Sequence, residues 1–133
     1  MKSAPTSPKR VASIDIGTNT ILLLIAEMDK GRINFLFEME TVVRLGEGVQ
    51  KNGILSKEAM NRGLQTLAQY LERCQEMEVQ KIFVAGTSAL REAKNSEDFL
   101  KLAKEKLNLS IEVISGEEEA QLSFLAVVRI SRR

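Results

Sequence analysis

Residues 11–26 read Val-Ala-Ser-Ile-Asp-Ile-Gly-Thr-Asn-Thr-Ile-Leu-Leu-Leu-Ile-Ala, two apolar runs joined by a polar turn. Gly17 and Asn19 tolerate the backbone conformations that a tight turn requires. The apolar run after the turn lacks polar alternation, which is typical of a strand covered on both faces. This stretch therefore predicts a pair of buried strands whose connecting turn presents carboxylate and hydroxyl side chains.

Further elements follow from the pattern on the C-terminal side of this pair. The expected order is β-β-β-α-β-α-β-α, and strands that alternate with helices imply parallel pairing with crossover connections. We expect an α/β fold with a mixed sheet of about five strands and helices on both faces. The later elements are a third strand at 33–45, a helix from an N-cap at Ser56 to about Met77, a strand at 81–85, a helix capped by Ser96, a strand at 111–114 and a last helix opened by Ser115 and Glu118.

Composition restricts the chemistry that the chain can perform. The 133 residues contain no histidine, so histidine-based acid–base catalysis and histidine metal sites are excluded. Nineteen Lys and Arg balance 18 Asp and Glu, so no net field favours nucleic acid or a membrane. Cys74 is the single cysteine, which fits a cytoplasmic protein without disulfides. Residues 1–10 are predicted to be a disordered lead-in, and residues 11–133 a single lobe.

The turn at residues 15–20 is the first candidate site. Successive backbone amides in a tight turn, with the hydroxyls of Thr18 and Thr20, form a concavity suited to phosphate oxygens. Asp15 stands at the strand end, where a carboxylate can hold a divalent cation. The alternative is a plain hairpin turn in which Asp15 bonds nearby amides, and the pattern leaves both open.

Two further groups of residues are candidates. Thr87 follows a buried strand, at the end where open α/β sheets bind ligands, and Arg91 offers a forked cation suited to phosphate. A plain surface arginine is the alternative. The carboxylates at 117–119 stand in a first helical turn, where they can simply complement the helix dipole.

Several segments resemble the exopolyphosphatase/guanosine pentaphosphate phosphohydrolase (Ppx/GppA) family, within the actin, sugar-kinase and heat-shock-chaperone ATPase superfamily. They occur in family order over roughly residues 11–128. The matching segments are Asp-Ile-Gly-Thr-Asn-Thr at 15–20, Arg-Leu-Gly-Glu-Gly at 44–48, Leu-Ser-Lys-Glu-Ala-Met at 55–60, Gly-Thr-Ser-Ala-Leu-Arg-Glu-Ala-Lys-Asn at 86–95 and Ile-Ser-Gly-Glu-Glu-Glu-Ala at 114–120.

The resemblance implies a ribonuclease-H-like (actin-like ATPase) half-domain and a site that hydrolyses polyphosphate or guanosine pentaphosphate. It implies that Glu119 is the catalytic base and that Asp15 holds Mg²⁺. Glu117 and Glu118 then serve the helix end. The phosphate-binding residues that it implies are Gly17, Thr18, Asn19, Thr20, Thr87 and Arg91.

The resemblance also implies a second lobe with an Asp-x-Gly-Gly-Gly-Ser-Thr-Glu phosphate loop, which the sequence does not contain. The chain alone is therefore expected to be inactive or nearly so, and to self-associate or to be complemented by such a lobe. One alternative is a nucleotide-binding half of a kinase-like or chaperone-like ATPase. Another is a phosphate-binding module without catalysis.

Overall fold

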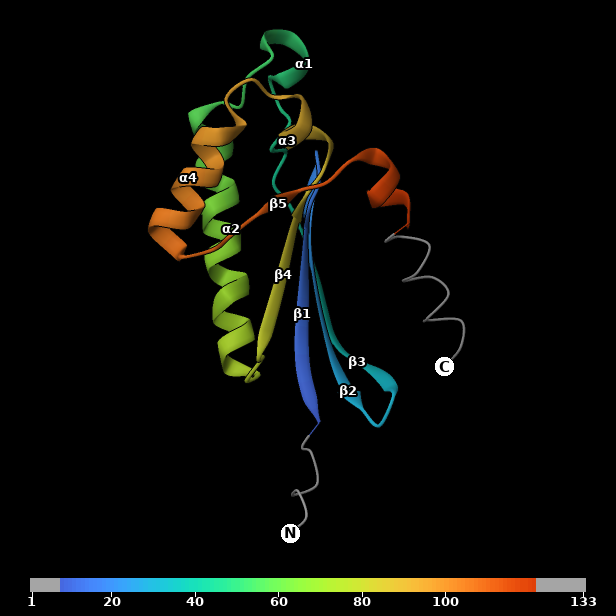
Figure 1. The fold of residues 1–133 in the computed structure, drawn as a ribbon. Helices are drawn as coiled ribbons and strands as arrows, with labels where there is room; N and C mark the ends of the chain where they lie inside the picture. The colour runs from blue at the N-terminus through green and yellow to red at the C-terminus, as the bar shows by residue number, and fades with distance from the viewer. Residues whose placement is uncertain (1–7, 122–133) are drawn as a thin grey trace.

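The computed structural model describes residues 8–121, which form a five-stranded mixed sheet (Figure 1). The strand order is β3-β2-β1-β4-β5, with β2 antiparallel to both neighbours and β4 and β5 parallel to β1. This topology confirms the predicted ribonuclease-H-like α/β fold. The strands are β1 Lys9–Ile16, β2 Thr20–Asp29, β3 Arg32–Val42, β4 Lys81–Gly86 and β5 Glu112–Val113.

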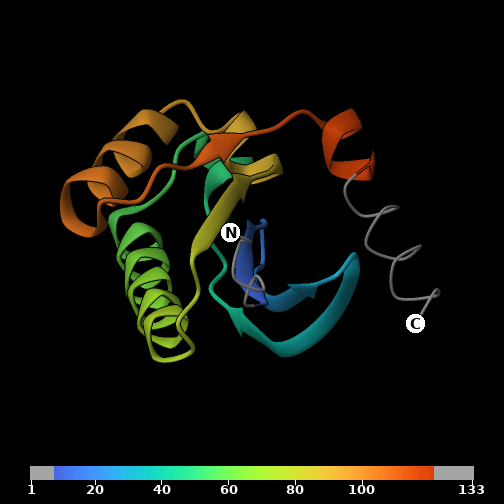
Figure 2. The ribbon, with the colours of Figure 1, turned by 60° about the horizontal axis from the view of Figure 1, so that its bottom comes forward.

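Two helices, α2 (Lys57–Glu76) and α4 (Ser96–Leu107), lie together on one side of the sheet (Figures 1 and 2). Their apolar side chains pack on the strand residues that point to the same side, and Tyr70 and Phe99 are the largest side chains buried there. A last helix begins at 116 and lies beyond the other side of the sheet in both views. Among the residues described, no helix has the length and apolar character needed to cross a membrane.

Short helices follow two of the strands and were not predicted. Helix α1 (Val49–Asn52) comes after β3, and α3 (Ser88–Glu92) comes directly after β4. The third strand ends at Val42 instead of residue 45, because the amides of Val43 and Arg44 donate to the carbonyl of Asn19. The chain thereby leaves the sheet and passes over the turn that joins β1 to β2.

The predicted helix caps had different outcomes. Ser56 is the N-cap of α2, since its hydroxyl accepts from the amide of Ala59 at 3.1 Å. Ser96 is not a cap: it is the first residue of α4, and its hydroxyl donates to the carbonyls of Leu90 and Ala93. The prediction was wrong because this hydroxyl is buried against the preceding turn, where it satisfies backbone carbonyls.

The limits of the chain segments also differ slightly from expectation. β1 already begins at Lys9, inside the expected lead-in of residues 1–10. Residues 1–7 and the distal part of the last predicted helix lie outside the described residues.

Candidate functional site

The ends of β1 and β4 form the floor of the site. These strands are parallel neighbours with Ile16 opposite Gly86, so the segments that follow them emerge side by side. Thr87, only 3% exposed, donates to the carbonyl of Ile16 from both its amide and its hydroxyl, each at 3.0 Å. Thr87 therefore ties the two strand ends together, and its hydroxyl hydrogen is already used within the protein.

The turn between β1 and β2, which we call the phosphate loop (residues 17–20), is fixed by backbone hydrogen bonds. The amide of Gly17 donates to the carbonyl of Thr20 at 2.9 Å. The carbonyl of Asn19 accepts from the amides of Val43 and Arg44, both at 2.8 Å. Within residues 8–121, the amides of Thr18 and Asn19 have no acceptor and remain available to a ligand.

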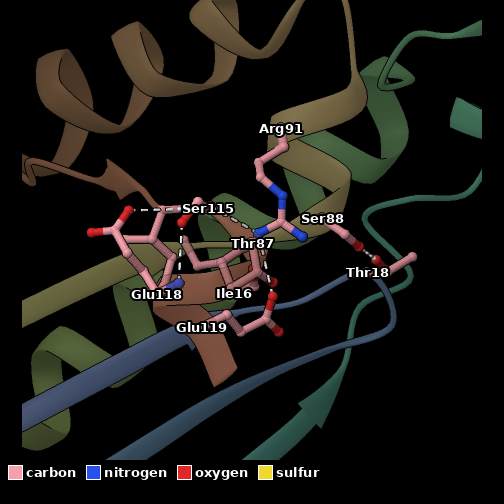
Figure 3. Close-up of polar contacts among 9 residues, drawn as sticks. Ile16, Thr18, Thr87, Ser88, Arg91, Ser115, Glu118 and Glu119 are labelled. Carbon is pink, nitrogen blue, oxygen red and sulfur yellow. Dashed lines mark hydrogen bonds and ion pairs between the residues drawn. The ribbon is translucent and has the colours of Figure 1, made fainter. Parts of the chain in front are cut away.

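The side chain of Thr18 is held from opposite directions. Its hydroxyl lies 2.6 Å from the hydroxyl of Ser88, the first residue of α3 (Figure 3). Its methyl group faces Gly46, where an added Cβ would lie only 2.5 Å from Thr18 Cγ2. The carbonyl of Thr18 also accepts from the amide of Gly46 at 2.9 Å. Segments after β1, β3 and β4 thus meet at this one threonine.

Arg91 projects from α3 toward the start of the last helix (Figure 3). Its Nη1 donates to the carbonyl of Ile114 at 2.8 Å and lies 3.3 Å from Oε1 of Glu119. The arginine and glutamate side chains are 29% and 38% exposed, so solvent screens the ion pair and it contributes little to stability. Such a pair can rearrange when an anion binds.

The carboxylate of Glu119 lies close enough to Asp15 to affect the ionisation of Asp15. Loss of water contacts raises the pKa of the Asp15 carboxyl above its usual value, and the negative charge of Glu119 raises it further. Asp15 nevertheless stays partly exposed. The two carboxyl groups are therefore neighbours, as a shared site would require.

The Asp15 carboxylate suits a magnesium ion that is bound together with a phosphate. Mg²⁺ is commonly held by one or two carboxylates, with phosphate oxygens and water as its other ligands. No group of three or more Asp, Glu, His or Cys residues able to hold a metal occurs within residues 8–121. A dedicated protein cage is therefore absent from that part of the chain.

The neighbouring glutamates have different surroundings. The amide of Ser115 donates to Glu118 Oε1, and the amide of Glu118 donates to the Ser115 hydroxyl, both at 3.1 Å. This is the predicted capping box, and it is confirmed. Glu117 and Glu118 are exposed, whereas Glu119 is turned toward Arg91.

Sequence reasoning chose most of these residues and missed others. The structure brings together Asp15, the phosphate loop, Arg91 and Glu119. The contacts of Ser88 and Gly46 with Thr18 were not foreseen, although both residues lie in segments quoted for the family resemblance. A hydroxyl directly after Thr87 was the available signal for Ser88. The roles in substrate binding and catalysis stay predictions.

Comparisons with known proteins identify the family to which the chain belongs. The sequence pattern of the Ppx/GppA phosphatase family matches residues 24–132. The chain is 38% identical over 131 residues to a guanosine-5'-triphosphate,3'-diphosphate pyrophosphatase of Aliivibrio fischeri strain MJ11, covering 98% of this chain and 26% of that protein. The chain thus spans about a quarter of the length of this curated relative.

Solved structures show the same likeness. A Ppx/GppA family member from Aquifex aeolicus superposes with a TM-score of 0.87 at 34% identity, over 92% of this chain and 40% of that one. An exopolyphosphatase from Cytophaga hutchinsonii gives 0.82 at 36% identity, over 86% and 36%. The family pattern covers well over half of the chain, and the fold agrees along most of its length. The chain therefore belongs to the Ppx/GppA phosphatase family, of whose members it represents the N-terminal portion.

Proposed function

We propose that this chain forms one side of a phosphohydrolase site. The site would release terminal orthophosphate from inorganic polyphosphate, or the 5'-phosphate of guanosine pentaphosphate. The observation that carries the proposal is the meeting of Asp15, Arg91 and Glu119, which come from widely separated parts of the sequence, beside free amides of the phosphate loop.

The chain's own groups divide the work of binding. The free amides of Thr18 and Asn19 donate to oxygens of the terminal phosphate, as in other backbone anion sites. Arg91 turns part of its guanidinium from Glu119 to the phosphate, a small change because the ion pair is partly exposed. Gly17, Thr20 and Thr87 support the loop, since their internal hydrogen bonds fix its shape.

Glu119 is the residue proposed to act on water. Its carboxylate orients a water molecule in line with the scissile bond and takes a proton from it as the water oxygen bonds to phosphorus. The P–O bond to the departing phosphate breaks in the same step, and its oxygen keeps the electron pair. A carboxylate is adequate for this task, because phosphoryl transfer depends more on positioning than on a strong base. Arg91, at 3.3 Å, holds Glu119 on the site side of the helix. Magnesium, bound by Asp15 and the substrate, would supply neutralisation of the phosphate charge.

Binding and turnover require separate tests, since the chain spans about a quarter of its curated relative. Inorganic tripolyphosphate with Mg²⁺ should bind the chain in calorimetry, and Glu119→Gln should bind it about as well. Turnover is measured in a chimera that carries this chain in place of the matching segment of the Aliivibrio fischeri enzyme. Glu119→Gln in an active chimera should abolish orthophosphate release; full release would show that the glutamate has another role.

The same measurements discriminate the alternative functions. A nucleotide-binding half of an ATPase would bind ATP more tightly than tripolyphosphate, because contacts to the base and ribose would add affinity. A catalytically silent module would bind tripolyphosphate and give chimeras without orthophosphate release. Asp15→Asn should lose the gain in tripolyphosphate affinity that Mg²⁺ gives the parent chain. A variant that keeps this gain would contradict the metal role of Asp15.

A further inference from the structure

The hydroxyl pair of Thr18 and Ser88 is the feature that the proposed function leaves unexplained. The two oxygens lie 2.6 Å apart, although the residues are 70 positions apart in the sequence. They connect the phosphate loop after β1 to the first residue of α3, which follows β4 (Figure 3). Neither hydroxyl has another hydrogen-bond partner within residues 8–121.

The pair has a defined number of hydrogens. Each hydroxyl carries one hydrogen and can accept two hydrogen bonds. One hydrogen is used between Thr18 and Ser88, so one remains for a ligand. If Ser88 donates, the free hydrogen belongs to Thr18, next to the free amides of Thr18 and Asn19. A bound anion that accepts from those two amides favours donation from Ser88 to Thr18, because the anion can then also accept from the Thr18 hydroxyl.

The packing around Thr18 fixes where its hydroxyl points. Threonine is branched at Cβ and has few accessible side-chain rotamers. Its methyl group lies against Gly46, at a place where an added Cβ would be 2.5 Å away. Rotation about the Cα–Cβ bond would move the methyl out of this gap and break the contact with Ser88. The hydroxyl direction is therefore set jointly by Gly46 and Ser88.

We propose that Ser88 is a positioning residue for phosphate binding. Its hydroxyl donates to Thr18 Oγ1, so that the Thr18 hydroxyl donates outward to a phosphate oxygen. Hydrogen bonds arranged in such a chain strengthen one another. This inference rests on the proposed function, since it concerns the same phosphate loop, but it assigns a role to a residue outside the predicted set.

The test is a thermodynamic cycle on the full 133-residue chain, with inorganic tripolyphosphate and Mg²⁺ as the probe. Ser88→Ala should weaken binding about three- to tenfold, the effect of losing one hydrogen bond. Ser88→Thr, which restores the hydroxyl, should bind like the parent chain. Thr18→Val keeps the shape and removes the donor; in that background Ser88→Ala should have no further effect. Thermal unfolding identifies any variant whose fold is damaged.

Each outcome has a defined meaning. Unchanged affinity of Ser88→Ala, or the same loss with and without the Thr18 hydroxyl, overturns the inference. If the parent chain does not bind tripolyphosphate, the proposed function fails on its own account. The amide NMR signals of Thr18 and Asn19 then test whether Ser88 positions the loop. Signals that shift in Ser88→Ala and keep their parent positions in Ser88→Thr support this role. Signals that do not change in Ser88→Ala overturn it.

Discussion

Replacing Gly46 with alanine will disturb the phosphate loop from outside it. Gly46 does not have a positive φ, so alanine is compatible with its backbone. The new Cβ would, however, lie 2.5 Å from Thr18 Cγ2 and 3.5 Å from Ala89 Cβ. Carbon atoms in contact are normally about 3.5–4.0 Å apart, so Gly46 and Thr18 must separate by about 1 Å or more.

The cost of this separation follows from what holds Thr18. Moving the threonine stretches its 2.6 Å contact with Ser88 and the 2.9 Å hydrogen bond from Gly46 to its carbonyl. Overpacking of this kind costs about 1–3 kcal/mol of the free energy of unfolding. A domain of this size loses about 4 °C in Tm for each kcal/mol. If the Thr18 hydroxyl and amide bind phosphate as proposed, each hydrogen bond lost through this displacement should lower tripolyphosphate affinity by about three- to tenfold.

The assay combines thermal unfolding with calorimetric titration of tripolyphosphate and Mg²⁺. Thr18→Ser removes the methyl group that would clash and keeps the hydroxyl, so it should restore affinity to Gly46→Ala. Gly63→Ala is the matched control, because its added Cβ would meet Phe99 at 3.1 Å, on the helix side of the sheet. It should alter Tm and leave affinity unchanged. A Gly46→Ala chain that binds tripolyphosphate like its parent would refute the described packing.

Three further predictions concern the groups around this loop. Asp15→Asn should become progressively more stable than the parent as the pH rises from the usual carboxyl pKa to the raised pKa of Asp15, because ionising Asp15 opposes folding over that interval, and the difference should then level off; thermal unfolding should show less than about 1 kcal/mol, given the partial exposure. Thr87→Val should lower the free energy of unfolding in urea by about 0.5–1.5 kcal/mol, because the carbonyl of Ile16 loses the hydroxyl donor and keeps the amide donor; an unchanged midpoint would contradict the tie between β1 and β4. Arg91→Lys keeps the positive charge but loses the paired N–H donors of the guanidinium group, so calorimetry should show tripolyphosphate affinity reduced about tenfold. Equal affinity would exclude a directional contact between Arg91 and phosphate.

The predictable part of the fold is the part that depends on near neighbours in the sequence. The apolar spacing from Met60 to Cys74 predicted α2, and its residues face the sheet as expected. The capping box at Ser115 and Glu118 was predicted for the same reason, since both partners stand within one helical turn. These elements can be predicted because the residues that form them lie close together in the sequence.

The contacts that shape the site depend on sheet register, which no local pattern contains. Thr18 meets Ser88 only because β1 and β4 are parallel neighbours that end at the same level. The short helix α3 continues from this junction, where the Arg91 amide donates to the Thr87 carbonyl at 3.0 Å. Its five residues are too few to show a helical period. The motif resemblance identified the segments that form the site, but it did not show which of their hydrogen-bond donors are already bonded within the protein.

The charges at the site explain why a cation belongs in the proposed reaction. Asp15 and Glu119 carry one negative charge each when ionised, and Arg91 carries one positive charge, so these three groups sum to −1. A polyphosphate end would meet a net repulsion from them, which agrees with the mutual effect that already raises the pKa of Asp15. A divalent cation would change the sum to +1 and so replace this repulsion by attraction. In the proposed reaction, substrate binding would therefore depend on metal binding. The amides and hydroxyls of the phosphate loop would give direction to an attraction that the charged side chains alone do not provide.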